Sequence, residues 1–110
     1  MRVNILGTEY TIAEFSKEEY AFPENCDGCC DSTSKTIVIL SNDVDSNLDD
    51  YRTYKNKVMR HEIIHAFLNE SGLQENFEHA NRYGHEETMI DWIAYQFPKM
   101  LKVFEEAGCM

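Results

Sequence analysis

The chain has 110 residues, of which 43% are hydrophobic and 12% aromatic. This length and composition predict one domain over residues 1–110 with its own hydrophobic core, and they exclude a largely disordered chain. Ten basic residues stand against 20 acidic ones, so the net charge is −10 at pH 7. So acidic a surface disfavours binding to nucleic acid and to anionic membranes.

No apolar stretch approaches the length of a membrane-spanning helix, since the longest is the run of four aliphatic residues at 37–40. The first seven residues, MRVNILG, lack the long apolar segment of a secretory signal peptide. We therefore expect a cytoplasmic protein without a membrane partner, in which the four cysteines are reduced.

The first 40 residues predict a small sheet. Residues 3–6 and 10–15 alternate between apolar and polar side chains around Gly7, which favours a β-hairpin. Residues 35–40 are rich in β-branched side chains and are bounded by turn formers, so they are the best strand in the chain.

Residues 26–31, CDGCCD, are open to two interpretations. A C-x-x-C spacing is typical of zinc sites and of redox pairs, but the chain has no second such pair, and Cys109 stands alone near the C-terminus. We expect a turn that carries Cys26, Cys29 and Cys30 as free thiols. A regulatory metal site or a redox role is the alternative.

Residues 48–69 carry apolar side chains at mixed three- and four-residue spacings, which predicts a long helix. Ser46 with Asp49 three residues later resembles a capping box at its start. Gly72 suits the left-handed position that ends such a helix.

A second helix is predicted from about Glu86. Pro98 either kinks this helix or opens a further one, and Gly108 ends it. The fold class is therefore α+β, with a small antiparallel or mixed N-terminal sheet packed on one long helix plus one or two C-terminal helices. The side chains expected to point inward from the second helix are Met89, Ile90, Ile93, Ala94 and Phe97.

The motif His61-Glu62-Ile63-Ile64-His65 lies in the last turns of the first predicted helix. His61 and His65 are one turn apart and face the same way, so both imidazoles can reach one metal ion. Glu62 is offset around the helix axis, where its carboxylate can accept a proton from a water molecule rather than bind the ion. The H-E-x-x-H spacing thus predicts two zinc ligands and a general base.

A catalytic zinc ion needs a third protein ligand. Glu87 and Asp91 are spaced i and i+4 on the second helix, so Glu87 can bind the ion while Asp91 accepts the outer N–H of a zinc-binding histidine. Glu86 is the rival third ligand, although it has Ile90 rather than an acid four residues later.

Together, His61-Glu62-Ile63-Ile64-His65 and Glu87-Thr88-Met89-Ile90-Asp91 resemble the gluzincin metallopeptidases, whose pattern is H-E-x-x-H followed by E-x-x-x-D. The strand at 35–40 and the two helices further resemble small zincin-like proteins of phages and Gram-positive mobile elements. The resemblance covers residues 35–101. It implies a zincin-like fold and one Zn²⁺ ion, with a protein or peptide as substrate. The implied site residues are the ligands His61, His65 and Glu87, the base Glu62 and the supporting carboxylate Asp91.

The expected reaction is hydrolysis of a peptide bond by a water molecule that zinc activates and Glu62 deprotonates. Candidates for an additional donor to the transition state are His79, Tyr83 and His85. The strand at 36–40 is the expected binding edge for an extended peptide. The alternative function is a zinc-binding regulatory or structural protein that acts through a protein partner without proteolysis.

Overall fold

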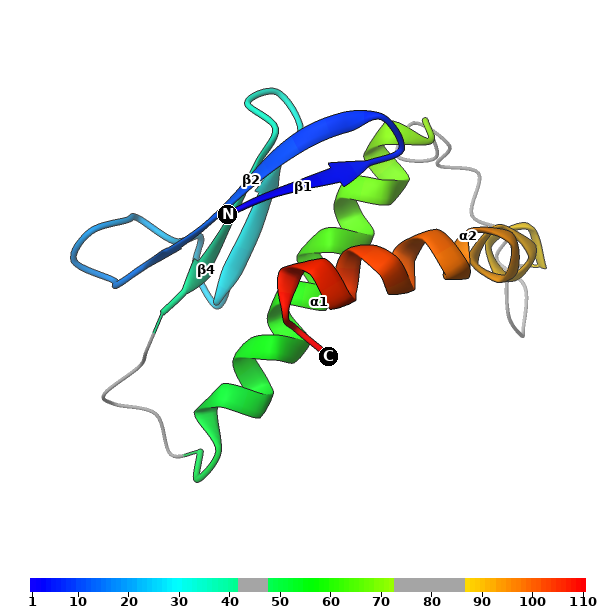
Figure 1. Ribbon diagram of the computed structural model, residues 1–110. Helices are drawn as coiled ribbons and strands as arrows, with labels where there is room; N and C mark the ends of the chain where they lie inside the picture. The colour runs from blue at the N-terminus through cyan, green and yellow to red at the C-terminus, as the bar shows by residue number, and fades with distance from the viewer. Residues whose placement is uncertain (42–47, 73–86) are drawn as a thin grey trace.

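The computed structural model describes residues 1–41, 48–72 and 87–110, with the backbone alone at residues 87, 88, 90, 91 and 94. Four strands form one mixed sheet in the order β1-β2-β4-β3, and two helices follow, α1 (Tyr51–Glu70) and α2 (Glu87–Ala107). Both helices pack on the same face of the sheet, with α1 running beneath it and α2 crossing α1 (Figure 1). The predicted α+β class with a mixed sheet is confirmed.

The predicted hairpin is present as β1 (Arg2–Ile5) and β2 (Thr8–Phe15), which pair antiparallel. Its two-residue loop places both Leu6 and Gly7 at positive φ, 51° and 93°. This is the backbone of a type I′ turn, whose twist matches that of the paired strands. The Oδ1 atom of Asn4 accepts a hydrogen bond from the N–H of Gly7 at 2.9 Å, which further fixes the turn.

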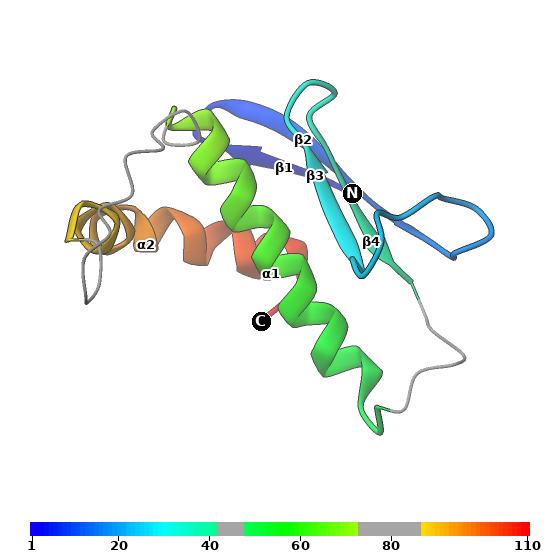
Figure 2. The ribbon, with the colours of Figure 1, turned by 180° about the vertical axis from the view of Figure 1, so that it is seen from behind.

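Two predictions about the sheet were wrong. Residues 26–31 are not only a turn, because Gly28–Asp31 forms strand β3, which pairs antiparallel with β4 (Thr36–Leu40). Strand β4 also pairs in parallel with β2, so both of its edges are occupied and an extended peptide cannot pair with residues 36–40. The outermost strand on this side is β3, which lies next to α1 when the molecule is seen from behind (Figure 2).

Helix α1 begins later than predicted, at Tyr51, and Asp50 is its N-cap; the predicted cap Ser46 lies outside the described residues. The Oδ1 atom of Asp50 accepts a hydrogen bond from the N–H of Thr53 at 3.0 Å, as an N-cap side chain does. The helix ends as expected, with Gly72 at φ 76°.

Helix α2 continues through Pro98 to Ala107, so Pro98 lies inside one helix and does not open a further one. Its predicted inward face was wrong at Ile93 and Phe97, which are 40% and 49% exposed. Among the described side chains of α2, the buried ones come from its C-terminal half, and the helix packs against β1 and α1. These core residues are Met100, Val103, Phe104 and Ala107.

The core lies between the sheet and the helices and contains aliphatic side chains from every layer. Tyr10, Ile37, Ile39, Ile63 and Phe67 are fully buried there. Within the residues described, no helix is both long and apolar enough to cross a membrane.

Candidate metal centre

Two histidines of α1 lie side by side at its surface. His61 and His65 are one helical turn apart, which points their side chains in the same direction. Their Nε2 atoms are 3.1 Å apart, and their ring centroids are 4.8 Å apart. The structure therefore brings the two predicted histidine ligands together.

The histidine pair fits a zinc ion in both spacing and protonation. Zn–N bonds of about 2.0–2.1 Å at a tetrahedral angle place two ligand nitrogens about 3.3 Å apart, close to the separation of the two Nε2 atoms. Burial lowers the pKa of His65, and the neighbouring charge of His61 lowers it further. A lowered pKa favours the neutral imidazole, which is the form that binds a metal.

The other predicted zinc ligand and its supporting carboxylate belong to α2. Glu87 is the first residue of α2, and Asp91 follows in the same helix one turn later, as their predicted spacing requires. Their side chains lie outside the part of the chain that the structure describes, as do the predicted residues His79, Tyr83, His85 and Glu86. Among the side chains that are described, no group of three or more His, Cys, Asp or Glu is arranged to hold an ion.

Glu62 lies on the side of α1 that faces β3, and only 7% of its surface is exposed. A Cβ atom placed on Gly28 of β3 would lie 3.2 Å from Oε1 of Glu62 and 3.1 Å from its Cγ. Burial raises the pKa of the Glu62 carboxyl above its usual range, and the neighbouring His61 opposes part of this shift. Burial thus makes this carboxylate a stronger proton acceptor than an exposed glutamate.

Gly28 allows α1 to approach the sheet closely. A Cβ atom at this position would lie 2.8 Å from Cγ1 of Val58, which is closer than carbon atoms that are not bonded to each other approach. The glycine is therefore required by packing against the helix. Its missing side chain leaves the space that the Glu62 side chain occupies.

A groove runs between β3 and α1, past the histidine pair. It consists of two hollows of about 210 and 380 Å³, whose walls share Cys26, Gly28, His61 and Glu62. The smaller hollow extends toward the N-terminus of α1, and the larger one extends toward its C-terminus, where His65 lies. Because β3 is the outermost strand of the sheet, its outer edge offers backbone N–H and C=O groups to a bound chain.

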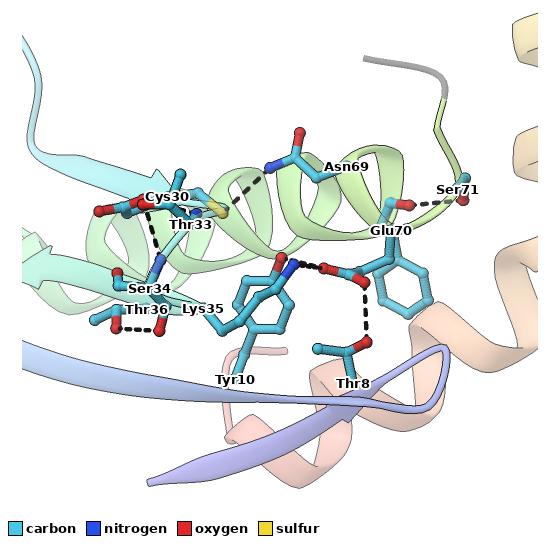
Figure 3. Close-up of polar contacts among 12 residues, drawn as sticks. Thr8, Tyr10, Cys30, Thr33, Ser34, Lys35, Thr36, Asn69, Glu70 and Ser71 are labelled. Atoms are coloured by element: carbon cyan, nitrogen blue, oxygen red, sulfur yellow. Dashed lines mark hydrogen bonds and ion pairs between the residues drawn. The ribbon is translucent and has the colours of Figure 1, made fainter. Parts of the chain in front are cut away.

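The cysteines of β3 point to opposite faces of the sheet, as successive residues of a strand do. Cys30 is in contact with the core next to α1, where Nδ2 of Asn69 donates to its Sγ at 3.8 Å (Figure 3). Burial, and then the charge of Glu62, raises the pKa of Cys30 to about 11, so this thiol is protonated at neutral pH. Cys29 instead has its Sγ 3.3 Å from the hydroxyl of Tyr20.

All four cysteines are free, in agreement with the thiols expected from the sequence. A protonated thiol is a weak metal ligand and a weak nucleophile. Cys30 thus contributes packing and a hydrogen bond to the wall of the groove.

The sequence analysis missed the contribution of β3 to the site. Gly28 and Asn69 were not identified, although both line the groove. The available signal was a glycine within a short segment between two turn-forming regions, which can mark a strand that another backbone or side chain approaches closely.

Comparison of the chain with models of protein families, with curated proteins and with solved structures found no match. The function has therefore to be inferred from the chemistry and geometry of the groove.

Proposed function

We propose that this chain is a zinc-dependent metallopeptidase of the gluzincin-like type. The observation that carries the proposal is the buried carboxyl of Glu62 beside the paired imidazoles of His61 and His65, at a groove bordered by the outermost strand of the sheet. A buried acid of raised pKa in a groove is a strong candidate for a catalytic group.

In this proposal His61 and His65 hold the ion through their Nε2 atoms. Glu87 is the third ligand, and Asp91 accepts the outer N–H of one of the two histidines. A bound zinc ion supplies a Lewis acid and lowers the pKa of water in the site to about 7. The mixed sheet packed on α1 and α2 agrees with the α+β class on which the proposal is built.

Glu62 moves the proton in this reaction. Its carboxylate accepts a proton from the attacking water and then passes it to the leaving amine of the peptide bond. Burial helps in the first step, because a carboxylate that is poorly solvated binds a proton more strongly. His79, Tyr83 and His85 remain the candidates for an additional donor to the developing oxyanion.

The substrate is proposed to be a protein or peptide segment in extended conformation. Among the strands that the structure describes, β3 pairs with β4 alone, so a peptide can pair with its outer edge and extend the sheet. This assigns to residues 28–31 the role that the sequence suggested for residues 36–40. The groove follows β3 past His61 and Glu62, so a peptide bound there passes the proposed reacting groups.

A zinc protein without peptidase activity is the competing function. A purely structural zinc site has no chemical use for a buried carboxyl group next to its ligands, and burying such a group lowers stability. The proposed peptidase accounts for Glu62, whereas the competing function does not.

The test is hydrolysis of an unfolded protein, such as reduced casein, by zinc-loaded protein. We expect activity that a chelator abolishes and that added zinc restores. Glu62→Gln should bind one zinc ion per chain and lack activity, whereas Glu105→Gln, an exposed glutamate of α2, should be fully active. If Glu62→Gln hydrolyses casein like the wild type, or if no zinc is bound, the proposal is wrong.

A further inference from the structure

One end of the groove is charged and aromatic, and the other is neutral. The hollow of about 210 Å³ toward the N-terminus of α1 is lined by Asp27, Tyr54 and Lys57 together with His61 and Glu62. The hollow on the other side of the histidine pair is lined by the uncharged residues Cys30, Ser32 and Asn69. A bound peptide therefore meets different chemistry on the two sides of its scissile bond.

Lys57 is the cation at the charged end. It precedes His61 by four residues, so it lies on the same side of α1 and about 5–6 Å further along the helix axis. Lys35 and Lys55 form ion pairs with Glu70 and Glu14, whereas Lys57 forms none with the side chains that the structure describes. Within the described part of the chain, no ion pair neutralises the charge of Lys57.

The surroundings of Lys57 hold it in place. Its Nζ lies 5.3 Å from the ring centroid of Tyr54, which is a cation–π contact. The hydroxyl of Tyr54 donates to Oδ2 of Asp27 at 2.8 Å, and this hydrogen bond raises the pKa of Tyr54, so the ring stays neutral. The backbone carbonyl of Asp27 in turn accepts from the N–H of Leu40 at 2.9 Å. The subsite is thus attached to the sheet before any ligand binds.

We propose that Lys57 selects peptides with an acidic side chain close to the bond that is cut. The inference rests on the proposed peptidase function. One residue of an extended peptide spans about 3.3 Å, so a group 5–6 Å from His61 meets a side chain within about two residues of the scissile bond. An ammonium group binds a carboxylate by a charge-assisted hydrogen bond. On a chain of net charge −10, Lys57 offsets the repulsion that an acidic substrate would otherwise meet.

Asp27 limits what else can bind there. Its carboxylate accepts a hydrogen bond from the Tyr54 hydroxyl and forms part of the wall, so a subsite built for a carboxamide would use both Asp27 and Lys57. A preference for glutamine over glutamate in the ligand would indicate this different subsite and would overturn the proposal.

The experiment measures binding and cleavage with the same probes. Three fluorescent decapeptides, identical except for a central Glu, Gln or Lys, are titrated into zinc-loaded Glu62→Gln protein, which binds without turnover. We expect the Glu peptide to bind about two- to fivefold more tightly than the Gln peptide, a size typical of one exposed charge pair. Lys57→Met should abolish this preference and Lys57→Glu should reverse it toward the Lys peptide.

Lys55→Met is the matched control, because Lys55 is two residues away on the same helix but pairs with Glu14 outside the groove. It should keep the preference for Glu. A preference that survives Lys57→Met, or that Lys55→Met removes equally, would overturn the proposal.

The two proposals fail in different ways. If wild-type protein cuts none of the peptides while Glu62→Gln still binds the Glu peptide through Lys57, the peptidase proposal fails and the acidic subsite stands. If wild-type protein cuts the peptides at equal kcat/KM for Glu and Gln, the subsite fails and the peptidase proposal stands.

Discussion

Glu62 and Glu70 lie on the same helix, and their surroundings act on the two carboxyl groups in opposite directions. Glu62 is buried against β3, and this burial raises the pKa of its carboxyl group. Glu70 is surrounded by donors, and hydrogen bonds from Lys35 and then Tyr10 lower its pKa. The fold thus favours the charge at one position and opposes it at the other.

The contacts of Glu70 show what a stabilising carboxylate looks like in this fold (Figure 3). Its Oε1 accepts from the Tyr10 hydroxyl at 2.7 Å and from Nζ of Lys35 at 2.6 Å, and its Oε2 accepts from the Thr8 hydroxyl at 2.9 Å. These bonds tie the last turn of α1 to the β1–β2 hairpin and to the start of β4. Tyr10 is itself fully buried, so its hydroxyl depends on Glu70 for a partner.

The described residues provide no comparable set of donors to Glu62, and its buried position is difficult to explain by stability alone. A carboxyl group that loses solvation without gaining donors costs free energy. The comparison therefore assigns a structural role to Glu70 and supports a chemical role for Glu62. Substitutions at the two positions should separate these roles.

The largest effect is expected from Glu62→Gln on activity. Removing a general base lowers the rate of hydrolysis by about 10²- to 10⁴-fold. In the presence of a chelator, the variant should be at least as stable as the wild type, because an amide can be buried at a lower cost than a carboxylate. Casein hydrolysis and urea denaturation measure the two quantities. A variant that keeps its activity, or that unfolds at much lower urea concentration, would contradict the assignment.

The opposite pattern is expected for Glu70→Gln. Its amide cannot receive charge-assisted hydrogen bonds from Lys35, and it leaves the buried Tyr10 hydroxyl with a weaker acceptor. We expect a loss of about 2 kcal/mol in the free energy of unfolding. Glu105→Gln, at an exposed position of α2, should change it by less than about 0.5 kcal/mol. Equal stabilities of the two variants in urea denaturation would show that the Glu70 network does not stabilise the fold.

Gly28→Ala tests whether the space for Glu62 depends on the missing side chain. The new Cβ would lie 2.8 Å from Cγ1 of Val58, so α1 or β3 must move. Overpacking of this kind costs about 1–3 kcal/mol, and displacement of Glu62 should lower activity as well.

Val58→Ala provides the matching control for Gly28→Ala. Val58→Ala removes the Cγ1 atom that the new Cβ would meet. The double variant Gly28→Ala/Val58→Ala should therefore lose less free energy of unfolding than the two single variants lose together. Additive losses would mean that the clash with Val58 is not what constrains Gly28.

The sequence predicted those parts of the site that lie on one regular element. The spacing of His61, Glu62 and His65 on a long amphipathic helix was sufficient to place two imidazoles together and a carboxyl group beside them. The hairpin and the strand at 35–40 were also predicted, because alternating apolar residues and β-branched side chains are local signals.

The rest depended on contacts between distant segments. Residues 28–31 look like a turn by composition, and they form a strand only because β4 pairs with them and α1 covers them. For the same reason the sequence placed the binding edge at 36–40: no local pattern shows that β4 has partners on both sides. The partners of Glu70 are equally remote, since Tyr10 and Thr8 are about sixty residues away along the chain.

The smallest expected effect is the pH dependence of the contribution that Glu70 makes to the free energy of unfolding. Its pKa is lowered in the folded chain, so the folded state takes up a proton less readily than the unfolded state does. The contribution to stability is therefore complete above the ordinary glutamate pKa of about 4.3, and it is lost as the pH falls through the lowered value. The stability difference between wild type and Glu70→Gln should be constant between about pH 6 and 7 and should narrow toward pH 3.

Urea denaturation of both proteins in chelator, from pH 3 to pH 7, measures this difference. The contributions of the other carboxylates to the pH dependence cancel in this difference, because both proteins contain them. Asp31 is one of these groups, and hydrogen bonds from Thr33 and Ser34 lower its pKa to about 2. A difference that stayed constant down to pH 3 would mean that Glu70 stabilises the fold through packing alone. Glu62 and Glu70 would then differ in where their side chains lie, and not in how the fold acts on their charge.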